Sequence, residues 1–79
     1  MNELVLKEAT QEHVVYFYRP GGKGTQGEIR VNIGDGEVTV VSRASEDNNI
    51  ERYGLMAADA VKECVKERNF PMEFTQAWY

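Results

Sequence analysis

The sequence predicts an α+β domain, built as an antiparallel meander of three to four strands with one amphipathic helix packed on one face. Two short runs in which apolar and polar residues alternate flank the triplet Gly34-Asp35-Gly36. An alternation of period two, interrupted by an aspartate between glycines, is typical of a β-hairpin. From residue 50 to residue 68 the apolar residues recur at helical spacing instead. The 79 residues form a single small domain, near the lower size limit for a core without disulfides or metals.

Two runs that precede the hairpin are also predicted to be strands. Residues 3–8 alternate weakly and indicate an edge strand, whereas residues 12–18 form the strongest strand in the sequence. Apolar side chains occupy both faces of this second run: Val15 and Phe17 on one, and Val14, Tyr16 and Tyr18 on the other. This pattern predicts a central strand that is covered on both faces. Pro20 has no amide hydrogen to donate, so it is expected to end the pairing.

The glycine-rich segment 19–27 is expected to be a mobile connection into the hairpin. In the first hairpin strand Ile29, Val31 and Ile33 share one face, and in the second Val38 and Val40 do so. These residues are predicted to contribute to the core.

The helix is predicted over residues 50–68. The preceding polar segment supplies capping groups, because Asn48 or Asn49 can accept a hydrogen bond from the first turn and Glu51 suits its positive end. The apolar stripe consists of Ile50, Tyr53, Ala57, Ala60, Val61, Cys64 and Val65. The alanines keep this stripe shallow, so the helix can lie close to a sheet, and Asn69 and Pro71 are expected to end it.

The last segment alternates again, with Met72, Phe74 and Trp78 on one side. A strand that joins the sheet after the helix must take an edge position. Chain ends are usually small and polar, so the terminal aromatics Trp78 and Tyr79 predict an end that is docked on its own sheet or on a partner.

Composition and charge favour a cytoplasmic protein that binds neither membrane nor nucleic acid. The single cysteine excludes an internal disulfide and suits a reducing compartment, and no signal peptide is expected. The longest aliphatic and aromatic run, residues 14–18, is far shorter than the roughly 20 residues that span a bilayer. Residues 44–79 carry seven acidic and four basic side chains, which disfavours binding to phosphates.

The residues that could support catalysis are too few for a reaction site. His13 is the single histidine, and its neighbour Glu12 points to the opposite face of a strand. Cys64 lies late in the predicted helix, where the dipole disfavours a thiolate, so we interpret it as a small core residue. One cysteine and one histidine cannot close a zinc site. We therefore expect no enzymatic activity, no cofactor and no metal.

Two nucleic-acid or nucleotide interpretations are disfavoured. The run Gly21-Gly22-Lys23-Gly24-Thr25 lacks both the spacing and the following helix of a phosphate-binding loop, although Arg19 and Lys23 could still meet an anionic partner. Base-stacking on a sheet would use Tyr16, Tyr18, Arg30 and Arg43, but the sequence signatures of RNA-binding sheets are absent.

Three segments carry a resemblance to known sequences. They are Tyr16-Phe17-Tyr18-Arg19-Pro20, Gly27-Glu28 and the final Ala77-Trp78-Tyr79. Together they resemble a group of short uncharacterised proteins of Firmicute-type bacteria, some of them associated with phages or conjugative elements. The resemblance covers nearly the whole chain but is tied to no chemistry. It implies a small cytoplasmic bacterial protein, in some cases accessory to a mobile element, and it assigns no catalytic or ligand residue.

The sequence therefore predicts a non-enzymatic protein-interaction module, of an accessory or adaptor kind, whose partner is another protein or a second copy of the chain. The predicted surface consists of Tyr16, Tyr18, Arg19, Lys23, Trp78 and Tyr79. Pairing of an edge strand is the expected mode, because a small open sheet leaves backbone groups unpaired. The alternative is a weak nucleic-acid-binding accessory protein that uses the loop carrying Arg19 and Lys23.

Overall fold

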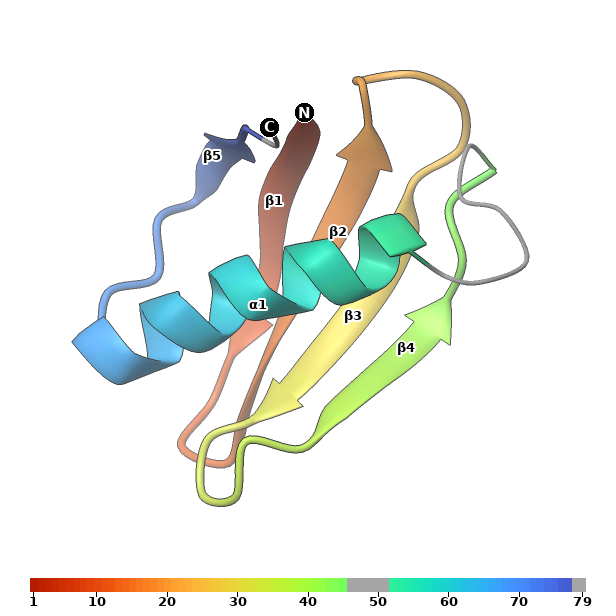
Figure 1. Ribbon diagram of the computed structural model, residues 1–79. Helices are drawn as coiled ribbons and strands as arrows, with labels where there is room; N and C mark the ends of the chain where they lie inside the picture. Colours follow the sequence, from red (N-terminus) through yellow and green to blue (C-terminus); the bar gives the residue numbers. More distant parts are fainter. Residues whose placement is uncertain (46–51, 78–79) are drawn as a thin grey trace.

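The computed structural model describes residues 1–45 and 52–77, which form one sheet with one helix across it (Figure 1). The elements are β1 (Asn2–Ala9), β2 (His13–Pro20), β3 (Gly27–Asn32), β4 (Val38–Ser42), α1 (Arg52–Glu67) and β5 (Glu73–Gln76). The antiparallel strands lie in the order β4-β3-β2-β1-β5. The predicted α+β meander with one helix is confirmed, and the closing strand joins at an edge, beside β1. The prediction that residues 3–8 form an edge strand is wrong, because β1 pairs with β2 on one side and with β5 on the other.

The centre of the sheet is β2, which pairs with β1 and β3. Val14, Tyr16 and Tyr18 are fully buried on the face that α1 covers. On the other face Val15 is only 5% exposed and Phe17 is half-buried. The prediction of a central strand is confirmed, but within the described residues its second face is shielded by side chains of neighbouring strands and not by another layer. β2 also runs through Pro20, which is still aligned with Asn2 of β1.

The two buried tyrosines of β2 use their hydroxyls to fix chain segments at opposite ends of the sheet. The Tyr16 hydroxyl donates to the carbonyl oxygen of Pro71 at 2.6 Å, in the connection between α1 and β5. The Tyr18 hydroxyl accepts from the amide of Ala44 at 3.2 Å, just beyond β4. The Tyr18 ring also lies against Gly27, where any side chain would collide with the ring and with the Ala44 backbone. Buried tyrosines with partnered hydroxyls combine apolar burial with a fixed orientation.

The β3–β4 hairpin turns through residues 33–36. The amide of Gly36 donates to the carbonyl oxygen of Asn32 at 2.9 Å, and the Asn32 amide donates to that of Glu37 at 2.9 Å. The Asp35 carboxylate accepts from the Glu37 amide at 2.9 Å. Gly36 has a φ of 72°, whereas Gly34 has no positive φ. The predicted hairpin is confirmed. Of its two glycines, only Gly36 adopts the left-handed backbone conformation that favours glycine.

The helix packs mainly on β3 and β2 through small residues. Its buried residues are Gly54, Ala57, Ala58, Val61 and Cys64. The predicted stripe was right for Ala57, Val61 and Cys64, but Ala58 is buried where Ala60 was expected, and Ala60 is only half-buried. The predicted caps Asn48, Asn49 and Glu51, and Ile50, lie outside the described residues.

The helix ends one residue before the predicted boundary. Arg68 adopts a left-handed φ of 54°. Its amide donates to the Val65 carbonyl at 3.2 Å, and the amide of Asn69 donates to the Cys64 carbonyl at 3.1 Å. These two bonds form a Schellman motif, in which the left-handed residue is usually glycine. Pro71 follows and cannot continue the helix.

The left-handed φ of Gly36 predicts that alanine substitution affects stability differently at the two hairpin glycines. Gly36→Ala should lower the free energy of unfolding by about 1–2 kcal/mol, because a Cβ disfavours the left-handed conformation. Gly34→Ala is the matched control, since a Cβ at either position meets open space, and it should leave stability nearly unchanged. Urea titrations followed by circular dichroism measure both, and equal effects would contradict this description of the turn.

The hydroxyl of Tyr16 predicts a pH-dependent contribution to stability. Burial, with a smaller effect of Cys64, raises the pKa of Tyr16 from 10.0 to about 12. The unfolded chain therefore loses this proton first, so stability should fall between pH 10.0 and about pH 12. Tyr16→Phe should reduce that fall and should cost about 1 kcal/mol at neutral pH through loss of the bond to Pro71. Urea titrations across this pH range test the prediction, which an identical fall in both proteins would contradict.

Candidate interaction surface

The sheet face opposite α1 carries no second layer within the described residues. Its centre is nevertheless shielded, because Lys7 of β1 and Glu28 of β3 form an ion pair at 3.1 Å that spans β2. The Lys7 ammonium group also lies 5.5 Å from the centre of the Phe17 ring. Contacts of this kind cover apolar side chains with charged ones. The centre of this face is therefore a poor candidate for an apolar docking site.

The two edges of the sheet differ in how well their backbone is protected. The β5 edge is short, with only four residues, and it begins with the charged Glu73. Its neighbours are Pro71 and Met72, of which the methionine is 79% exposed. Short, charged strands next to proline are typical of edges that do not pair further.

The β4 edge has neither a charge nor a proline. Its sequence from Val38 to Ser42 is Val-Thr-Val-Val-Ser, a combination of β-branched residues that favours strand pairing. Val38 and Val40 are half-buried on the helix side, and Val41 is 50% exposed. Val41 has no partner in β3, because the register shifts by one residue there. This bulge is a protective feature of the edge.

The backbone groups that β4 presents outward follow from its register with β3. The Asn32 amide bonds the Glu37 carbonyl, so the backbone of Glu37 points toward β3. Directions alternate along an antiparallel ladder, and therefore Thr39 also points inward. The N–H and C=O groups of Val38 and Val40 consequently point away from the sheet.

The predicted surface is wrong for Tyr16 and Tyr18. Both are fully buried beneath α1, because they share a face of β2 with Val14 and that apolar face is the one that the helix covers. Tyr16 and Tyr18 cannot form a base-stacking surface for the same reason, because both rings are buried. Arg30 is exposed, and in the register of β3 it lies on the opposite side of the sheet from both tyrosines.

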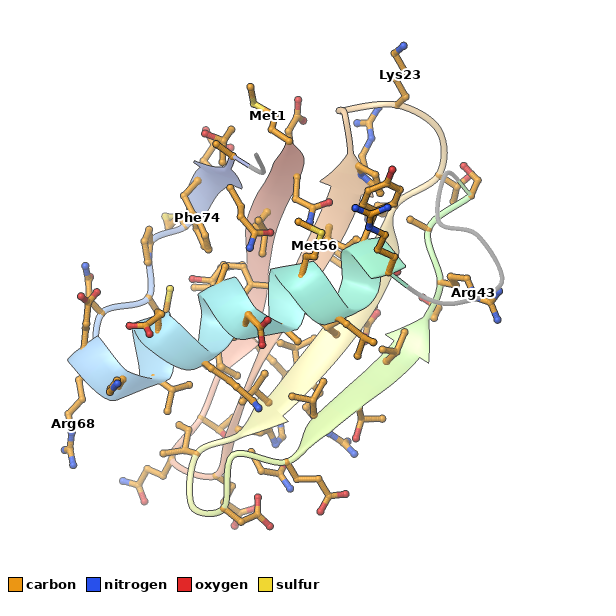
Figure 2. All side chains as sticks on the ribbon, in the orientation of Figure 1. Met1, Lys23, Arg43, Met56, Arg68 and Phe74 are labelled. Atoms are coloured by element: carbon orange, nitrogen blue, oxygen red, sulfur yellow. The ribbon has the colours of Figure 1, made fainter. Side chains whose placement is uncertain are left out.

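Of the remaining predicted residues, the structure describes Arg19 and Lys23, which lie on the same glycine-rich loop. Arg19 is half-buried and its guanidinium donates to the carbonyl of Gly22 at 2.8 Å, so it folds back on its own loop. Lys23 is exposed and projects from the tip of that loop (Figure 2). Trp78 and Tyr79 lie outside the described residues. The β4 edge was not among the predicted surface residues, although the uncharged, β-branched run of residues 38–42 was a usable signal.

The groups considered for catalysis lie in separate contacts. The imidazole Nε2 of His13 is 2.9 Å from a carboxylate oxygen of Glu8, in an exposed pair. Cys64 is buried on the sheet side of α1. Burial raises the pKa of the Cys64 thiol, and the carboxylates of Glu67 and Glu63 add to this effect. Among the described residues no group of three or more His, Cys, Asp or Glu side chains could hold a metal ion.

Comparisons with protein-family models, curated proteins and solved structures gave no match to this chain. Within residues 1–45 and 52–77, no helix has the length and apolar character needed to cross a membrane.

The environment of Cys64 predicts an inert thiol. A raised pKa keeps the sulfur protonated at neutral pH, and burial limits access. The reaction with a chromogenic disulfide reagent should therefore be at least about tenfold slower for the native chain than for the chain in urea. A native rate equal to the urea rate would show an accessible, activated thiol.

Proposed function

We propose that this chain is a non-enzymatic protein-interaction module that accepts an extended strand of a protein partner along the outer edge of β4. The observation that carries the proposal is the contrast between the two edges of the sheet. A partner strand at β4 would meet outward N–H and C=O groups at Val38 and Val40, with no charged side chain between residues 38 and 42. Main-chain hydrogen bonds supply the affinity in this mode of recognition.

The side chains around this edge support the same mode. Val38 and Val40 already contact the helix-covered core, so the apolar side chains of an added strand would extend that core. On the other face the exposed Val41 would gain a neighbour. Burial of apolar surface contributes about 25 cal/mol of favourable free energy per Å². An edge strand exposed to water does not gain this free energy until a partner strand covers it. The bulge at Val41 restricts regular pairing to a short stretch, so selective binding of a short segment is expected.

Proline substitutions test which edge binds partners. Val40→Pro removes an outward N–H without removing a bond to β3, and proline is tolerated where a strand's N–H faces solvent. We expect it to abolish capture of partner proteins from a native lysate, as measured by quantitative mass spectrometry of affinity-purified chain.

Thr75→Pro is the matched control. Leu6 donates to the carbonyl of Met72, so by alternation the backbone of Thr75 also points outward, but from β5. This variant should retain the partners that the Val40→Pro variant loses. Both variants must keep the circular dichroism of the parent chain. Equal recovery of every partner by the two variants would reject β4 as the binding edge.

A further inference from the structure

We infer that a hollow between the C-terminal end of α1 and the turns of the sheet binds a small amphiphilic carboxylate, that is, one carboxylate group on an apolar body. This inference goes beyond the proposed function and uses no residue of β4. The hollow has a volume of about 560 Å³, within the range of roughly 300–1,000 Å³ that is usual for small-ligand sites. Its lining consists of Gln11, Ile33, Val65, Lys66, Arg68 and Phe70.

Three separate segments of the chain form the walls of this hollow. The β1–β2 turn and the β3–β4 turn lie at the same end of the sheet (Figure 1). The amide of Ile33 in the second turn donates to the carbonyl oxygen of Glu12 in the first at 2.9 Å. Val65 and Phe70 pack against the hydrophobic core from the end of α1 and from the chain that follows it. The hollow is therefore held by main-chain and core contacts and exists before a ligand binds.

The floor of the hollow is apolar. Ile33, Val65 and Phe70 are each half-buried, so each retains apolar surface that a ligand can cover. Covering such surface is the main source of free energy for small-ligand binding, and a few polar groups then fix the orientation. The apolar body of the ligand is accordingly placed against these three side chains.

The charge at the rim of the hollow is positive only. Lys66 and Arg68 are exposed, and Arg68 extends away from the end of α1 (Figure 2). Within the described part of the chain neither cation is paired with a carboxylate. No lining residue is acidic, although the whole chain has a net charge of −4. An ammonium group and a guanidinium group are the cations that proteins use to bind carboxylates.

The helix end opposes an anion only weakly. The C-terminal end of a helix carries about half a negative charge, which is less than the two full positive charges of Lys66 and Arg68. The carbonyl oxygens of Cys64 and Val65 also already accept hydrogen bonds from the amides of Asn69 and Arg68. Arg68 adopts the left-handed conformation that glycine takes more easily. Its place there is explained by what the guanidinium binds and not by the backbone.

A neighbouring hollow restricts the ligand to a single anionic group. It shares Gln11 with the first hollow, and its lining includes the carboxylates of Glu12 and Asp35. A nucleic acid or another polyanion that reached across both hollows would meet these two negative charges. A compact ligand with one carboxylate avoids them.

Titration with n-octanoate, followed by the amide chemical shifts of the ¹⁵N-labelled chain, tests the inference. We expect saturable shifts at Ile33 and at residues 65–70, with a dissociation constant of about 1 mM or tighter. Octylammonium has the same apolar chain with the opposite charge, and acetate has the charge without the chain. Both should bind at these amides at least about tenfold more weakly.

Two variants test the role of the cations. Lys66→Gln and Arg68→Gly should each weaken octanoate binding by about threefold, because exposed ion pairs contribute modestly. Arg68→Gly should also be at least as stable as the parent chain in urea, since glycine suits the left-handed conformation. Lys23→Gln is the matched control. It removes the same charge at the opposite end of the molecule (Figure 2) and should leave octanoate binding unchanged.

Three results would each overturn the inference. The first is the absence of saturable shifts at Ile33 and residues 65–70 at about 10 mM octanoate. The second is binding of octylammonium at these amides as tight as that of octanoate. The third is a loss of affinity in Lys23→Gln equal to that in Lys66→Gln, which would show a general charge effect. Each variant is first checked for the circular dichroism spectrum of the parent chain.

Discussion

The packing of α1 against the Val14, Tyr16 and Tyr18 face of β2 is the contact on which the rest of the structure depends. A sheet must bury one face against another element to form a core, and the described chain offers one helix for this purpose. Full burial of a large apolar side chain contributes roughly 1.5–3 kcal/mol, so the central strand sets which face is covered. The small residues of α1, including Gly54 and Ala57, then let the helix lie close to these rings.

The same contact also fixes the ends of the sheet. The hydroxyls of Tyr16 and Tyr18 hold the segments at Pro71 and Ala44, which avoids the cost of burying an unpaired hydroxyl. A second group of hydrogen bonds lies at the start of β1. There the side-chain amide of the fully buried Asn2 donates to the Tyr53 carbonyl at 3.2 Å and to the Gln76 side chain at 3.0 Å. Strand β5 is thereby tied to both β1 and the helix. These hydrogen bonds fix the position of this four-residue strand.

The sequence allowed prediction of those features that depend on local patterns. The hairpin around Gly36 and the helix over its described residues follow from periodicity and turn residues. The edge position of the last strand follows from its joining the sheet after the helix. The exposure of Tyr16 and Tyr18 could not be predicted in this way, since alternation shows which residues share a face but not which face the helix covers. The prediction placed Ala60 on the buried stripe, whereas the structure buries Ala58. Both residues are small, so the angle at which the helix crosses the sheet determines which of them is buried. That β4 forms an uncovered edge could not be predicted either, because the place of a strand in the sheet is a tertiary property.

The strand order explains why β4 is the edge that no described strand covers. A four-stranded meander leaves both β1 and β4 unpaired on their outer sides, and the chain returns after α1 to pair β5 with β1. The eight-residue β1 is thus covered by a four-residue strand that begins with Glu73. No described segment does the same for β4, although its β-branched sequence favours pairing. Within the described residues one edge of the sheet is therefore covered by the last strand and the other is apolar and uncharged, and the proposed strand pairing at β4 depends on this difference.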